Sequence, residues 1–338
     1  MASIRERKGR WQARITRHGF LPETKSFDTH EGAVKWARAI EAEIDKGVFV
    51  SLKEAERTTL GDILLRYAEE VSPTKRSGKD NIAKLKFLAR QRFAALSLAN
   101  LTPKAIAKFR DDRLAVVSPG TVLLDLATIR SVLNHARREW GMAIENPVEK
   151  VRKPPAPPHR DRVLSAQEEE RLLTALTPGA LRNGDGRFTK ETRDHWLKPM
   201  VIIAIESAMR RGELLALEWK HVDQVRRTAH LPMTKNGRSR TVPLSSRAIR
   251  TLQEIPRSID GRVFPISHWT VEQVFERASK LAGLAGVHFH DLRHTAATRL
   301  AEKVPNLIEL AAITGHSNVG MLKRYYHPTA ENLALKLG

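Results

Sequence analysis

The sequence predicts a multi-domain, mainly α-helical protein with two small β elements. Apolar residues recur at helical spacing through most of the 338 residues, and a proline-rich segment interrupts that pattern. Short alternating runs occur near the N-terminus and again near residue 230. The expected parts are a three-stranded sheet plus helix at 1–55, a helical domain at 58–151, a linker at 152–162, and a mixed, mostly α-helical domain with a small β-hairpin or sheet at 163–338.

The N-terminal segment is predicted to form an antiparallel sheet of three strands followed by a helix. The runs SIRER, WQARITR and FLPETKSF are separated by KGR and HG, which are typical turn residues. Residues 29–45 place apolar side chains at helical spacing, so one helical face should cover the sheet. The other face should carry Arg5, Arg7, Arg10, Arg14 and Arg17. Such a face fits a DNA groove, although a solvated basic hairpin is the alternative.

The second segment is predicted to be helical throughout. Thr59 can cap its first helix, a second covers KDNIAKLKFLARQRF, a third begins near Pro103, and the longest covers GTVLLDLATIRSVLNHARREWG. Between helices lie the basic residues Lys75, Arg76 and Lys79. There they could reach DNA phosphates without disturbing a core, or form an ordinary solvated loop.

The linker RKPPAPPHRDR contains four prolines with flanking charges. Such a segment joins neither a helix nor a sheet interior, so we expect an extended, semi-stiff tether and a domain boundary. Two lobes joined by a basic tether suit a duplex, which must be gripped from two sides.

The third segment is predicted to consist of helices and one β-hairpin. Ser165 and Glu168 form a capping box, and Asn236-Gly237 predicts a two-residue hairpin turn. The polar insertion at residues 177–194 has no assigned role. Helices are expected at about 246–255, 270–282, 291–302 and 306–313.

Composition points to a polyanionic partner. With 58 Lys and Arg against 38 Asp and Glu, the formal net charge is +20, which favours nucleic acid. The absence of cysteine excludes disulfides, thiolate metal sites and cysteine nucleophiles. No apolar run approaches the roughly 18 residues of a membrane span, and no hydrophobic signal core begins the chain. We therefore expect a cytoplasmic protein with no membrane partner.

Four short motifs carry a resemblance to a known family. They are Arg-x-x-Glu at 210–213, His-x-x-Arg at 290–293, Gly-His at 315–316 and Tyr-x-His at 325–327. In this order, and with this interval between the last two, the third segment resembles the tyrosine site-specific recombinases of the phage-integrase type. The first two segments look like that family's arm-binding and core-binding domains. One departure is Ala208, where the family often has glycine.

The resemblance implies covalent phosphoryl transfer on DNA. A tyrosine oxygen attacks the scissile phosphate and leaves a 3′-phosphotyrosine and a free 5′-hydroxyl, which the partner strand's 5′-hydroxyl later reverses. Because the ester keeps the bond energy, no ATP, metal or other cofactor is expected, and no phosphate-binding Gly-Lys-Ser/Thr loop occurs.

The resemblance assigns Tyr325 as nucleophile, with Arg210 and Arg293 on the phosphate. Planar guanidinium groups can hold two non-bridging oxygens and stabilise the charge of the transition state. A phenol of pKa near 10 is roughly a thousandth ionised at neutral pH, so it needs a proton acceptor or a positive surround. His290 is the expected base or hydrogen-bond partner.

Other residues of the motifs receive supporting roles. Lys235, before the hairpin turn, is the expected general acid for the leaving 5′-oxygen, and His316 should hydrogen-bond a phosphate oxygen. Glu213 should orient Arg210. His294 is assigned to packing rather than catalysis, and Tyr326 to packing or to the DNA surface.

Two rival functions remain at this point. His288, His290 and His294 could form a metal site of a nuclease, since two of them have the i, i+4 spacing of zinc-binding helices; Arg293 inside that cluster argues against a dication. The second rival is a DNA-binding regulator without catalysis.

The resemblance also implies partners. Recombining two duplexes needs four active sites, which predicts a homotetramer on double-stranded DNA attachment sites. A host DNA-bending protein and an excision factor are further expected partners, in association with a bacterial nucleoid. The apolar tail with Leu333, Leu335 and Leu337 would dock on its own or a neighbouring subunit.

Overall fold

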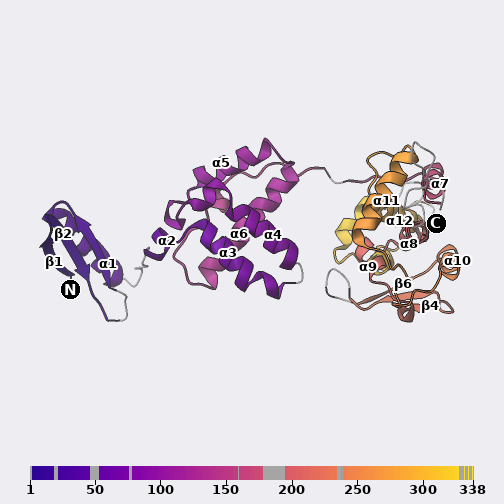
Figure 1. The fold of residues 1–338 in the computed structure, drawn as a ribbon, viewed down its shortest axis with the longest axis horizontal. Helices are drawn as coiled ribbons and strands as arrows, with labels where there is room; N and C mark the ends of the chain where they lie inside the picture. Colours follow the sequence, from indigo (N-terminus) through magenta and orange to yellow (C-terminus); the bar gives the residue numbers. More distant parts are fainter. Residues whose placement is uncertain are drawn as a thin grey trace. The chain divides into compact units, whose positions relative to one another are not determined.

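The computed structural model describes residues 2–18, 22–45, 53–75, 78–158, 160–177, 195–233, 237, 239–326, 331, 334 and 337. The chain divides into two compact units, Met1–Pro158 and His159–Gly338, and the division falls within the predicted linker. The predicted fold class is confirmed, because the described residues are mainly helical and contain two small three-stranded sheets (Figure 1).

The N-terminal sheet is antiparallel, in the order β1-β2-β3. Its strands are Ala2–Arg7, Arg10–Ile15 and Glu23–Phe27, and helix α1, His30–Asp45, follows. The helix packs on one face of the sheet, and the small core between them consists of Ala13, Ile15, Ala33, Ala37 and Ile44. Sheet and helix are therefore as predicted.

Most of the predicted arginine face exists. Strand register and exposure put Arg5, Arg7, Arg10 and Arg14 on the face away from α1. The expectation for Arg17 was wrong, because this residue lies beyond β2 and its guanidinium pairs with Asp45 at the end of α1. By strand alternation Arg17 belongs with Ile15, whose side chain is in the core.

The remainder of the first unit is helical. Thr59 and Asp62 form a capping box at the start of α3, with the Asp62 amide 3.1 Å from the threonine hydroxyl. The long helix α6 buries the predicted stripe, which contributes Val122, Leu126, Ile129, Leu133 and Ala136 to the core. The helices are α2 Lys53–Arg57, α3 Leu60–Glu70, α4 Gly78–Ala89, α5 Pro103–Leu114 and α6 Pro119–Arg138, with 3₁₀ turns η1 Ser72–Thr74, η2 Arg92–Ala95, η3 Leu98–Asn100 and η4 Pro147–Lys150.

One member of the basic cluster Lys75, Arg76 and Lys79 makes contacts within the protein. The Lys75 ammonium hydrogen-bonds the Tyr67 hydroxyl and lies 4.7 Å from that ring's centroid. Lys79 is exposed in the first turn of α4, and Arg76 lies outside the described residues.

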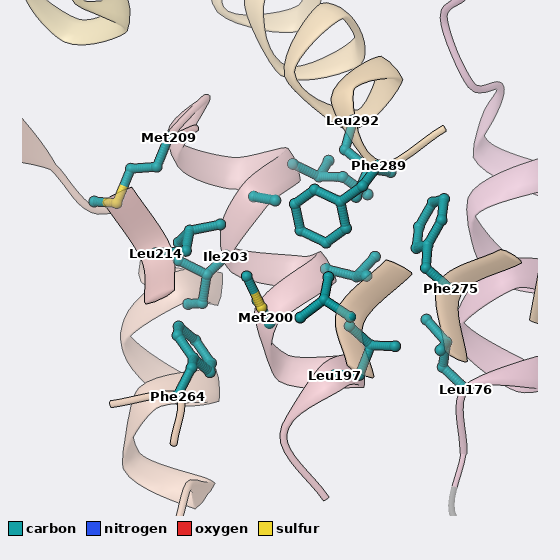
Figure 2. Close-up of a cluster of buried hydrophobic side chains, with 14 of the residues drawn as sticks. Leu176, Leu197, Met200, Ile203, Met209, Leu214, Phe264, Phe275, Phe289 and Leu292 are labelled. Carbon is teal, nitrogen blue, oxygen red and sulfur yellow. The ribbon is translucent and has the colours of Figure 1, made fainter. Parts of the chain in front are cut away.

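The second unit is built around the apolar helix α8, which packs against α10 and α12. Met200 and Ile203 of α8 belong to the same buried cluster as Phe289 and Leu292 of α12 (Figure 2). Its helices are α7 Ala166–Ala175, α8 Leu197–Ser207, α9 Arg211–Leu215, α10 Ser246–Glu254, α11 His268–Leu281, α12 Phe289–Lys303 and α13 Leu307–Thr314, with 3₁₀ turns η6 Trp219–His221 and η7 Val319–Arg324. Its strands are β4 Val222–Asp223, β5 Thr228–Leu231 and β6 Arg240–Pro243.

The predicted two-residue turn at Asn236-Gly237 does not fit the strand register. That turn would place Leu231 opposite Val242, whereas the structure pairs Leu231 with Arg240 and Ala229 with Val242. Ala229, Leu231 and Val242 are all buried in the observed register. The insertion at 178–194 lies outside the described residues. Within the described ranges, no helix is long and apolar enough to span a bilayer.

Candidate active site

The Arg-x-x-Glu motif lies at a sharp corner between α8 and α9. Helix α8 ends at Ala208, which has a left-handed backbone (φ 54°) and is fully buried. The next turn makes Arg210 the first flanking residue of α9, so that Glu213 points back toward it. The Glu213 carboxylate accepts from the Arg210 amide at 2.8 Å and from Arg210 Nη1 at 2.9 Å. The motif's spacing is therefore a helix cap that also fixes the arginine side chain.

The C-terminal end of α13 holds two arginines together. Gly315 ends this helix with φ 71°. The Thr314 carbonyl accepts from Arg293 Nη2 at 2.7 Å, and the Gly315 carbonyl accepts from Arg210 Nη2 at 3.2 Å. Carbonyls at a helix C-terminus carry partial negative charge, which offsets the repulsion between two guanidinium groups.

Arg293 is the most deeply buried cation of the site, with 4% of its surface exposed. It also donates to the Ala208 carbonyl and lies 3.3 Å from His316 Nε2. Burial, followed by the charge of Arg210, lowers its pKa to about 9, so it remains charged at neutral pH.

His316 is held as a neutral ring. Arg293 has no acceptor atom, so His316 Nε2 must accept and Nδ1 must carry the proton. Nδ1 then donates to the Thr314 hydroxyl at 2.7 Å, and that hydroxyl donates to the Leu310 carbonyl at 2.6 Å. Burial and the nearby Arg293 lower the His316 pKa to about 4.

A third arginine, Arg240 of β6, lies beneath the site. Its Nη2 donates to Glu213 at 3.0 Å, and its guanidinium rests against the α-carbon of Gly315. Among the described residues its Nε and Nη1 have no partner, and burial lowers its pKa. The sequence alone assigns no role to Arg240, because nothing in it marks this residue as buried. Among the described residues, three guanidinium groups around one carboxylate leave an excess of positive charge that suits a phosphate.

Tyr325 follows the 3₁₀ turn η7, and its ring packs against the small cluster of Ala301, Leu310 and Leu322. Its hydroxyl lies 2.6 Å from Nδ1 of His294, and its ring centroid is 6.2 Å from that of His316. Burial raises the pKa of the phenol. The phenol is therefore neutral in this structure and lies beside the histidine–arginine cluster.

The observed partner of the phenol is His294, not the expected His290. His294 is buried, whereas His290 is exposed, and their rings meet edge to face with centroids 5.2 Å apart. Burial lowers the pKa of His294, and partial burial of the imidazole, followed by the charges of His294 and Arg293, lowers the pKa of His290. Lys235 lies outside the described residues.

The linker end fixes the helix that carries these groups. Arg160 Nε and Nη2 each lie 2.8 Å from an oxygen of the buried Asp291, whose carboxylate also caps α12 through the His288 amide. One turn further, the Leu164 amide donates to the Thr295 hydroxyl at 2.9 Å. These contacts fix one side of α12, and His290 and His294 lie on another side of the same helix.

The histidine cluster does not assemble a metal site. Within the part of the chain that the structure describes, no three His, Asp or Glu side chains converge as metal ligands. Asp291 is instead occupied by Arg160, and His288 is exposed at the helix cap.

Comparison with known proteins decides the family. The family model described as "Phage integrase family" matches residues 162–332. The shufflon-specific DNA recombinase of Escherichia coli is 38% identical over 83% of this chain and 72% of its own length. A putative integrase/recombinase of Haemophilus influenzae is 35% identical over 100% of this chain and 91% of its own.

The chain belongs to the phage integrase family. This integrase is a site-specific DNA recombinase of the tyrosine type, an enzyme that cuts and rejoins DNA strands. A lambda integrase dimer bound to a COC′ core site resembles it in fold, with a TM-score of 0.64, 22% identity, and coverage of 96% of this chain and 94% of that one. The Tn1549 transposon integrase, solved with circular intermediate DNA, has a TM-score of 0.64 at 19% identity and covers 83% and 98%.

Proposed function

We propose that Tyr325 is the nucleophile of strand cleavage. Its oxygen attacks the scissile phosphate of a double-stranded attachment site, which gives a 3′-phosphotyrosine and a free 5′-hydroxyl. The observation that carries this proposal is the position of the phenol, hydrogen-bonded to the residue that follows Arg293 and beside the His316 ring. A nucleophile must start close to the groups that bind the reacting phosphate.

Arg210 and Arg293 are the proposed ligands of the non-bridging phosphate oxygens. Both are fixed by helix-terminal carbonyls, so they need little reorganisation when charge develops on the phosphate. Loss of one such donor typically costs about 10²- to 10³-fold in rate. His316 is the proposed hydrogen-bond donor to a phosphate oxygen. This requires the tautomer with its hydrogen on Nε2, so that Nδ1 then accepts from the Thr314 hydroxyl. The exposed His290 is proposed to reach the reacting atoms when DNA is bound. Lys235 is the proposed acid for the leaving oxygen.

The first unit is proposed to supply the remaining DNA contacts. Residues 1–55 would bind arm-type sites and residues 58–151 core-type sites, with 152–162 as the tether between this region and the catalytic domain at 163–338. The exposed arginines of the N-terminal sheet support a groove contact. These are Arg5, Arg7, Arg10 and Arg14, and we retain Arg17, Lys75, Arg76 and Lys79 only as candidate phosphate contacts.

The assembly is proposed to be a homotetramer on DNA that integrates, and also excises, a mobile element. Lambda integrase has been solved as a tetramer bound to a Holliday junction, and its chain covers 93% of this one in fold. A host DNA-bending protein, an excision factor, a cytoplasmic location and association with a bacterial nucleoid complete the proposal.

Trapping the covalent intermediate tests this function. The full chain is incubated with nicked duplexes carrying candidate attachment sites, because loss of the short cleaved strand prevents resealing. We expect an adduct that survives denaturant and maps by peptide mass to Tyr325. Tyr325→Phe should abolish the adduct while DNA binding persists, and Tyr326→Phe, the matched neighbour, should keep it. An adduct that survives Tyr325→Phe would refute the assignment.

A further inference from the structure

We propose that His294, rather than His290, accepts the proton of Tyr325 during strand cleavage. The proposal rests on Tyr325 being the nucleophile and names the group that makes its oxygen reactive. None of the four sequence motifs assigns a role to His294, which only follows Arg293 in the chain.

The contact itself is short and protected. Tyr325 Oη and His294 Nδ1 are 2.6 Å apart, within the range of a strong hydrogen bond from a hydroxyl. His294 is only 7% exposed, so bulk water does not compete for this nitrogen. His290 is the more exposed of the two residues, and its ring meets the His294 ring edge to face. The phenol therefore has one histidine, and not a pair, as its immediate acceptor.

The position of His294 in the fold links proton transfer to phosphate binding. His294 and Arg293 are consecutive in α12, and that helix is fixed by the Arg160–Asp291 pair. Because the proton acceptor His294 and the phosphate-binding Arg293 are adjacent in one helix, their backbone positions are fixed relative to each other. The acceptor thus reaches the phenol in the same geometry in which the arginine reaches the phosphate.

Transfer of the Tyr325 proton to His294 and attack on phosphorus occur in one displacement step. With Nδ1 accepting the hydroxyl proton, the neutral ring carries its own hydrogen on Nε2. As the Tyr325 oxygen bonds to phosphorus, its O–H bond breaks and the proton passes to Nδ1, giving an imidazolium. The bond from phosphorus to the 5′-oxygen breaks, and that oxygen takes a proton from a separate acid, for which Lys235 is the proposed group. In resealing, His294 returns its proton to the departing phenolic oxygen.

Charges around His294 come from three elements. The groups that face it are His290, Asp291 and Arg293 of α12, Arg324 and Tyr325 at η7, and Asp161 of the linker. The two carboxylates favour an imidazolium and the two arginines oppose it, while burial lowers the His294 pKa. The ring is therefore neutral and able to accept a proton at pH 7. Negative charge that develops on the phosphate then stabilises the imidazolium.

The pH dependence of adduct formation tests the proposal. Single-turnover rates of covalent adduct formation are measured with the full chain in excess over nicked DNA, from pH 6 to pH 10. His294→Asn keeps a hydrogen-bond acceptor near the phenol but cannot take a proton. We expect a rate about 10²- to 10⁴-fold below wild type at pH 7, as for loss of a general base. That deficit should shrink roughly tenfold for each pH unit, because hydroxide then ionises the phenol directly.

Controls separate this proposal from folding and from the proposed function. DNA binding and thermal unfolding of His294→Asn are compared with those of His290→Asn, the adjacent histidine, whose rate should show no steep pH rescue. A fluorinated tyrosine at position 325, which has a more acidic phenol, should restore the His294→Asn rate at pH 7. A His294→Asn rate equal to wild type, or a deficit independent of pH, would overturn the proposal. Abolition of the adduct by Tyr325→Phe in the same assay would leave the nucleophile assignment intact.

Discussion

Gly315 offers the sharpest test of how the site is packed. Its backbone is left-handed, and a β-carbon added there would lie 2.7–2.8 Å from Nε, Nη1 and Cζ of Arg240. Atoms cannot approach so closely, so Gly315→Ala should displace the Arg240 guanidinium from its position against Glu213. The substitution should therefore disturb the site as well as the helix end.

The expected cost follows from two contributions. A left-handed conformation costs a non-glycine residue about 1–2 kcal/mol. Loss of the hydrogen bond from Arg240 to the Glu213 carboxylate adds about 1.5–3 kcal/mol, as for bonds to charged groups. Together they lower the free energy of unfolding of the second unit by roughly 2.5–5 kcal/mol, which corresponds to about 5–20 °C in its melting temperature.

Calorimetry on the full chain measures this shift, and a double-mutant cycle isolates its cause. In an Arg240→Ala background the clash is absent, so Gly315→Ala should cost only the backbone contribution of about 1–2 kcal/mol. If Gly315→Ala lowers the melting temperature equally in both backgrounds, contact with Arg240 is not the cause and the reasoning fails.

Three further outcomes are expected. Ala208→Gly should raise the free energy of unfolding by about 1 kcal/mol, seen as a higher melting temperature, because Ala208 has φ 54°; a lower one would contradict this. His316 has a folded-state pKa of about 4, below its ordinary value, so its stabilising contribution is complete above pH 6.5 and declines by roughly 2 kcal/mol between pH 7 and 5. Melting curves of His316→Asn should be flatter over that range than those of wild type, and equal slopes would argue against it. EDTA should leave adduct formation unchanged, because Arg293 among the histidines repels a divalent cation; inhibition reversed by added metal would revive a metal-dependent reading.

Local interactions explain why much of the fold could be predicted from the sequence. Thr59 with Asp62, and Ser165 with Glu168, form caps within three residues, and the apolar stripe of α6 repeats every turn. The Arg-x-x-Glu motif was predictable for a related reason, since Arg210 and Glu213 bond within one turn.

Contacts between residues far apart in the chain could not be predicted from the sequence. The Asn236-Gly237 turn predicted one register, but the strands pair in another, with Ala229 opposite Val242 and Leu231 opposite Arg240. Arg17 was predicted on the open face of the sheet, yet Asp45, 28 residues away, takes its guanidinium.

The sequence by itself determined the family, the helical architecture and that Arg210, Arg293, His316 and Tyr325 belong to one site, because periodicity, caps and motif spacing act over a few residues. Only the tertiary structure decided that His294 meets Tyr325, 31 residues away, and that Arg240 lies buried beneath Gly315. The physical reason is that such pairings depend on how α12, α13 and β6 pack together, and no pattern within any one of these elements encodes it.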